Sequence, residues 1–132
     1  MPTWTQIGLV AGGSALGGLT RWLVTDWFAQ WFGKDFPWGT LFINVSGSLF
    51  LGWFFTSVAE RLTDTSWVRP DDMKLLVAVG FTGAYTTFST FEYDTHVLLR
   101  DKHGLVGAAY VALSVFLGLL AVRLGVTLAK PR

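Results

Sequence analysis

The sequence predicts an all-α membrane protein with four transmembrane helices, and its composition and charge pattern both support this prediction. Hydrophobic residues make up 52% of the 132 residues, whereas charged residues make up only 14%. Soluble domains carry about 25% charged residues, so this chain has roughly half of the usual supply for a wetted surface. The formal net charge of +1 provides no basic field for nucleic acid. The absence of cysteine excludes a disulfide framework and a thiolate metal site.

Four stretches without charge divide the chain into spans. They cover residues 1–20, 36–59, 75–91 and 104–122, with lengths of 20, 24, 17 and 19 residues. A bilayer core requires about 20 apolar residues per helix, within a range of roughly 17 to 25. With their apolar flanks, the stretches predict spans at about 4–28, 37–60, 73–95 and 104–128 in one transmembrane domain, 1–132. The first stretch has no positive n-region, so we expect a retained helix rather than a signal peptide.

The charges flanking these spans select neither orientation firmly. Four spans place the N-terminus, the second loop and the C-terminus on one side, with six basic residues: Arg61, Arg69, Lys74, Arg123, Lys130 and Arg132. The other side has four: Arg21, Lys34, Arg100 and Lys102. This bias is compatible with dual insertion and an antiparallel homodimer, and equally with one orientation set by a small margin. Tryptophans that suit the two interfaces flank the first loop (Trp22, Trp27, Trp31, Trp38) or the opposite side (Trp4, Trp53, Trp67).

Polar residues recur at helical spacing within the second and fourth spans, and glycines do so within the first. In the second span, Thr40, Asn44 and Ser48 share one face, and in the fourth span Tyr110 and Ser114 do the same. Polar side chains in hydrocarbon need partners or a wet cavity. Asn44 could clamp two helices together, but Thr40 on the same face favours a polar path. The glycines of the first span, which precede Arg21, are typical of close helix packing.

The third span contains the most unusual segment, residues 80–91 (GFTGAYTTFSTF). Two glycines and five serine or threonine hydroxyls argue against a continuous helix, although a simple kink is an alternative. A break frees backbone carbonyls, which is tolerated at membrane depth only where they are buried or bind something. Na⁺ is a suitable partner for such oxygens. Phe88 and Phe91 lie three residues apart and can share a face, where contact with lipid or core is the ordinary role.

Residues 38–48 (WGTLFINVSGS) and 83–91 (GAYTTFSTF), with the glycine-rich stretch 12–18 before Arg21, resemble the Fluc (CrcB) fluoride-channel family. The resemblance covers essentially the whole chain. The family often has Gly-Gly where this chain has Gly83-Ala84, and a polar residue where it has Gly118.

The resemblance implies a passive, fluoride-selective channel in a bacterial-type inner membrane that exports fluoride and relieves its toxicity. It also implies an antiparallel homodimer with two pores and a structural Na⁺ at its centre, held by the carbonyls of Gly83 and Thr86. The family's pore residues correspond to Asn44, Phe88 and Phe91, with further polar contacts from Thr40, Thr87, Tyr110 and Ser114. Arg21 could draw anions toward a vestibule or anchor the helix in lipid headgroups.

Three other functions are less compatible with the sequence. A dual-topology small multidrug-type exporter has a similar size, but export coupled to protons requires a membrane-embedded carboxylate, which the first span lacks. A membrane enzyme would need a nucleophile with a base in reach, whereas His96 and His103 lie near a loop. Glu92 and Asp94 are expected at the vestibule or interface. A purely structural bundle leaves Asn44 and the Thr-rich segment unexplained.

Overall fold

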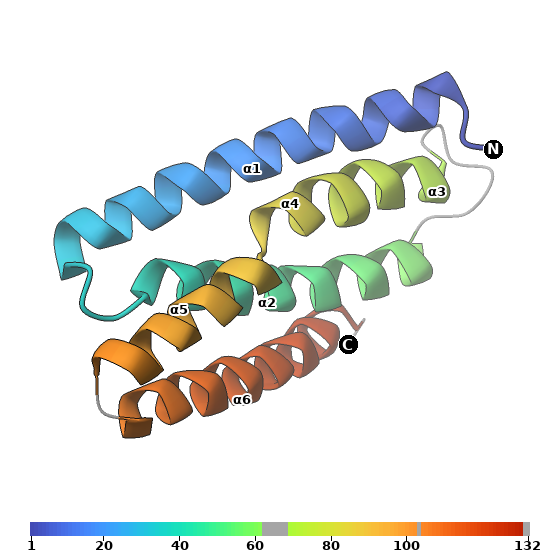
Figure 1. The fold of residues 1–132 in the computed structure, drawn as a ribbon. Helices are drawn as coiled ribbons and strands as arrows, with labels where there is room; N and C mark the ends of the chain where they lie inside the picture. The colour runs from blue at the N-terminus through green and yellow to red at the C-terminus, as the bar shows by residue number, and fades with distance from the viewer. Residues whose placement is uncertain (62–68, 103, 131–132) are drawn as a thin grey trace.

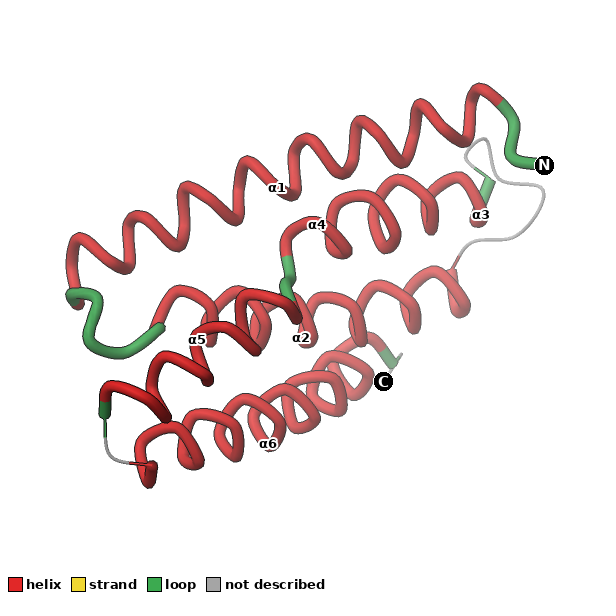
Figure 2. Tube along the Cα trace, viewed as in Figure 1, coloured by secondary structure: helices red, strands yellow, loops and turns green. Residues whose placement is uncertain are grey.

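The computed structural model describes residues 1–61, 69–102 and 104–130, and these residues form a bundle of helices without strands (Figure 1; Figure 2). The helices are α1 (Trp4–Phe32), α2 (Trp38–Arg61), α3 (Pro70–Met73), the π-helix η1 (Lys74–Thr82), α4 (Gly83–Tyr85), α5 (Phe88–Asp101) and α6 (Gly104–Ala129). Three residues to which the sequence assigned a location, Trp67, His103 and Arg132, lie outside the described residues. The start of α1 and the end of α6 lie at the same end of the bundle (Figure 1).

Local sequence signals account for both ends of the first helix. Thr3 caps α1 because its hydroxyl accepts a hydrogen bond from the Gln6 backbone at 3.2 Å, while the Gln6 side chain accepts one from the Thr3 backbone at 2.9 Å. This reciprocal capping box satisfies two donors that the helix itself leaves free. Gly33 ends α1 with a positive φ of 76°, a region that glycine enters without steric cost.

Glycines allow the helices to pack backbone against backbone. α1 packs along η1, where a Cβ atom at Gly13 or Gly17 would run into the backbone of Leu76 or Phe81. α2 packs along α6 in the same manner, with Gly52 against the backbone of Val122. The close packing expected for the glycines of the first span is therefore confirmed at Gly13 and Gly17. Gly12 and Gly18 have no neighbour within 4 Å of a built Cβ.

The helix of the third predicted span is broken, as the sequence predicts. Thr86 (φ −83°, ψ 160°) and Thr87 (φ −150°, ψ 125°) are extended and separate α4 from α5. Within the described residues, three helices are long and apolar enough to cross a membrane (α1, α2 and α6), and the expected third span is divided between η1–α4 and α5. The π-helical geometry of η1 was not expected from the sequence; in it, the Thr82 hydroxyl donates to the carbonyl of Val77, five residues back, at 2.9 Å.

Candidate functional site

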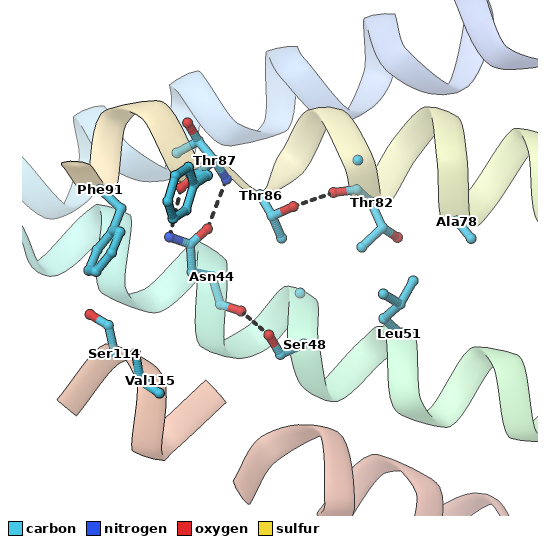
Figure 3. Close-up of a pocket in the computed structure, with 13 residues that line it drawn as sticks. Asn44, Ser48, Leu51, Ala78, Thr82, Thr86, Thr87, Phe91, Ser114 and Val115 are labelled. Carbon is cyan, nitrogen blue, oxygen red and sulfur yellow. Dashed lines mark hydrogen bonds between the residues drawn. The ribbon is translucent and has the colours of Figure 1, made fainter. Parts of the chain in front are cut away.

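A cavity of about 390 Å³ lies at the break between α4 and α5 (Figure 3). Its walls come from α2, from the segments on either side of the break and from α6. The lining residues are Asn44, Gly47, Ser48, Leu51, Ala78, Thr82, Gly83, Thr86, Thr87, Phe88, Phe91, Ser114 and Val115. A few polar groups therefore converge in a mostly apolar cavity, which is the usual character of a ligand site.

The structure brings most of the predicted site residues to this one place. Five of the seven predicted pore residues line the cavity: Asn44, Thr87, Phe88, Phe91 and Ser114. Both residues expected to hold a cation, Gly83 and Thr86, also line it. Thr40 and Tyr110 lie outside the lining, and α1, which carries Arg21, contributes no residue to it. The roles assigned to all of these residues stay predictions.

Asn44 is attached to the break by two hydrogen bonds. Its side-chain oxygen accepts from the backbone N–H of Thr87 at 2.8 Å, and its amide nitrogen donates to the Thr87 carbonyl at 3.0 Å. Figure 3 shows the amide turned toward this peptide. Asn44 thus acts as the helix clamp that the sequence left open as an alternative to a polar path. An amide nitrogen carries two hydrogens, so the clamp leaves one donor of Asn44 for another partner.

The two phenylalanines follow directly after the clamp. Thr87 caps α5, since its hydroxyl accepts from the backbone N–H of Thr90 at 3.3 Å. The ring centroids of Phe88 and Phe91 are 6.0 Å apart with an interplanar angle of 44°. Phe91 also contacts Tyr110, at 5.3 Å between ring centroids, whereas Phe88 is 73% exposed in the single chain. The rings therefore share the cavity side of α5, and Phe88 extends to the surface of the protomer.

The break also leaves backbone carbonyls free. The carbonyl of Thr82 accepts from both the backbone N–H and the hydroxyl of Thr86, at 3.0 and 2.9 Å. No hydrogen bond among the described residues engages the carbonyl oxygens of Gly83 and Thr86. The donor that would reach Gly83 in a continuous helix is the Thr87 N–H, and that group bonds to Asn44 instead. Hard oxygen atoms of this kind fit Na⁺.

One buried hydroxyl at the site, that of Ser114 in the cavity wall, has no hydrogen-bond partner among the described residues. A buried hydroxyl without a partner loses the hydrogen bond it makes to water, at a cost of roughly 1–3 kcal/mol. Ser114 therefore contributes a buried hydroxyl without a partner to the cavity wall.

Asp94, expected from the sequence at the vestibule or interface, makes a contact that the sequence did not identify. It lies half-buried in α5, and its carboxylate accepts a hydrogen bond from the Thr40 hydroxyl at 2.8 Å. Thr40 itself is 6% exposed. The carboxylate thus binds α5 to α2 inside the bundle, while Glu92, two residues earlier, is exposed. The sequence pattern that could have indicated this contact is the three-residue spacing of Phe88, Phe91 and Asp94, which places all three on one helix face.

The fold and the site together define a multi-pass integral membrane protein with a polar, ring-lined cavity at a helix break. A family model described as "CrcB-like protein, Camphor Resistance (CrcB)" matches residues 8–126. The chain belongs to this family.

Curated relatives match over nearly the whole chain. The chain is 44% identical over 129 residues to a protein of Trichormus variabilis, covering 98% of this chain and 91% of the relative. It is 43% identical over 127 residues to one of Nitrobacter winogradskyi (96% and 97% covered) and 41% identical over 125 residues to one of Rhizobium meliloti (95% and 96% covered). Each is named a fluoride-specific ion channel, FluC. These names denote a channel and not an enzyme, and they favour a channel over the exporter alternative. The chain is an integral protein of the bacterial inner membrane.

Proposed function

We propose that the protein is a passive, fluoride-selective channel that lets fluoride leave the cell and so relieves its toxicity. The observation that carries this proposal is the convergence of an amide, a free hydroxyl and two phenylalanine rings on one cavity at the helix break. The names of the relatives support fluoride as the ion.

Fluoride is small and strongly hydrated, so a pathway through lipid must replace its water with other hydrogen-bond donors. The remaining N–H of Asn44 and the Ser114 hydroxyl are donors of this kind. Phe88 and Phe91 can add the electropositive edges of their rings, which attract an anion weakly. Weak contacts suit conduction, because an ion must be able to leave each site. Thr40, Thr87 and Tyr110 would add polar contacts along the same route.

An antiparallel homodimer would complete the site with two pores and a central Na⁺. Gly83 is exposed in the single chain, and Phe88 is 73% exposed. Both residues lie at the break, so this side of the protomer is a suitable surface for a second copy. A two-fold axis beside the break would supply each carbonyl of Gly83 and Thr86 twice, giving the Na⁺ four oxygen ligands. The ion would hold the two copies in register and would not be transported.

Arg21 would serve at the membrane surface, either as an attraction for anions or as an anchor in the headgroups. It is half-buried on α1, away from the cavity lining. A long cationic side chain there can reach the interface while its stem stays in lipid.

Fluoride efflux from liposomes tests the proposal. Purified protein reconstituted into vesicles loaded with potassium fluoride should release fluoride rapidly to an electrode once an ionophore allows charge balance. Vesicles loaded with potassium chloride should keep their chloride. Fluoride retention equal to that of empty vesicles, or chloride release at a similar rate, would refute the function. Cysteine pairs placed to cross-link only an inverted dimer would test the orientation, which a purely parallel pattern of cross-links would contradict.

A further inference from the structure

One turn of α2 contacts both residues of the break. Asn44 binds the Thr87 peptide through its two hydrogen bonds, and a Cβ atom at Gly47 would run into the methyl group of Thr86. Beside this turn, Ile43 is fully buried, and the Ser48 hydroxyl donates to the carbonyl of Asn44 at 2.7 Å. α2 therefore provides the surface against which the two extended residues rest.

The Thr87 N–H is a group that neither helix can satisfy. It follows the last turn of α4 and precedes the first turn of α5. A buried backbone donor without a partner costs about as much as a lost hydrogen bond. Asn44 supplies an acceptor at 2.8 Å, and its own N–H returns a bond to the carbonyl of the same residue. The side chain thus pairs with Thr87 through one donor and one acceptor, as a neighbouring strand would.

We propose that Asn44 is a positioning residue, whose amide holds the Thr87 peptide and thereby sets where α5 begins and where Phe88 and Phe91 lie. The first ring is attached to the residue immediately after the clamped peptide, so a displacement of Thr87 is passed directly to Phe88. The same two bonds fix which way the amide faces, so the remaining N–H has a single direction. The claim that this placement affects permeation rests on the proposed function, whereas the claim that Asn44 places the rings does not depend on any ion.

A spectroscopic experiment without halide tests this placement. 4-Fluorophenylalanine is incorporated at position 88, and its ¹⁹F NMR signal is recorded in detergent micelles in halide-free buffer. Asn44→Ala should shift or broaden the signal, since the Thr87 peptide loses its partner. The matched variant Ser114→Ala removes another polar group from the same cavity but does not touch the break, and it should leave the signal in place. The same label at Phe54, in the other half of α2, should respond to neither variant.

An unchanged signal at position 88 in Asn44→Ala would overturn the inference, because an amide that only contacts the ion has no effect on the rings in its absence. Asn44→Leu provides a second variant, which also branches at Cγ but has no hydrogen-bonding group, and the same response is expected. Elution of each variant as the wild-type assembly on size exclusion shows that the comparison is made between folded proteins.

A double-mutant cycle on fluoride efflux tests whether the position matters for permeation. If Asn44 acts through the placement of Phe88, the Asn44→Ala, Phe88→Ile double variant should lose no more flux than the more impaired single variant. If the loss of flux in the double variant equals the product of the two single losses, the two residues act independently, and the claim that Asn44 acts on permeation through Phe88 is overturned. The control cycle of Ser114→Ala with Phe88→Ile should give losses that multiply. Absence of flux in the wild-type protein would refute the proposed function, while the halide-free spectra would still decide the placement of the rings.

Discussion

The hydrogen bond between Thr40 and Asp94 is an internal connection between α2 and α5 whose removal has a measurable cost. The Thr40 side chain is 6% exposed, and its hydroxyl donates to the half-buried carboxylate at 2.8 Å. Thr40→Val keeps the shape of the side chain and replaces the hydroxyl by a methyl group. The Asp94 carboxylate then loses its donor inside the bundle. The substitution therefore isolates one interaction with little change in packing.

Loss of this bond should lower the free energy of unfolding by about 1–3 kcal/mol, the range for removing one partner of a buried polar group. The assay is denaturant unfolding in detergent micelles, followed by tryptophan fluorescence, since the chain has seven tryptophans. Wild-type and variant proteins are compared at the same protein concentration, because the stability of an oligomer depends on it.

Thr40→Ser provides the matched control, because it keeps the hydroxyl and loses only a methyl group. We expect Thr40→Ser to stay within about 1 kcal/mol of the wild type, the size of one buried methyl or methylene group. A Thr40→Val protein as stable as the wild type would refute the reasoning. Equal destabilisation by the two substitutions would refute it as well, because the lost packing and not the hydrogen bond would then be the cause.

The remaining predictions concern packing, the free hydroxyl and the proposed cation. Gly17→Ala should reduce the yield of folded protein on size exclusion because its Cβ would collide with the backbone of Phe81, whereas Gly18→Ala, with nothing within 4 Å, should be tolerated. Ser114→Ala should leave the free energy of unfolding unchanged or raise it by up to about 1–3 kcal/mol, because the buried hydroxyl has no partner among the described residues, and should lower fluoride efflux several-fold. Replacing Na⁺ by a larger cation throughout purification and assay should weaken fluoride efflux, and undiminished flux in repeatedly exchanged vesicles would argue against the cation site.

The membrane-spanning character and the break were predictable because both depend on local sequence. Charge-free stretches of 17 to 24 residues identify apolar helices without knowledge of their neighbours. The break follows from the two glycines and the adjacent threonines in residues 80–91, which disfavour a regular helix whatever packs against it. The extended residues are Thr86 and Thr87, within the segment that the sequence indicated.

The contacts of the site were harder to predict because they depend on how distant helices are registered. Asn44 and Thr87 are 43 residues apart, and Thr40 and Asp94 are 54 apart. Helical periodicity shows which residues share a face, but it does not show which residue on another helix they meet. For this reason the sequence left the clamp and the polar path open for Asn44, and it did not indicate that Asp94 would bond to Thr40.

Because α1 begins and α6 ends at one end of the bundle (Figure 1), the design of a covalently linked dimer is constrained. A short flexible tether from the last residue of one copy to the first residue of the next would force both copies to insert the same way up. An oppositely inserted pair would instead need a tether that itself traverses the bilayer, such as one additional hydrophobic helix. Two fusions that differ only in that extra segment would therefore distinguish a parallel dimer from an antiparallel dimer in a single expression experiment.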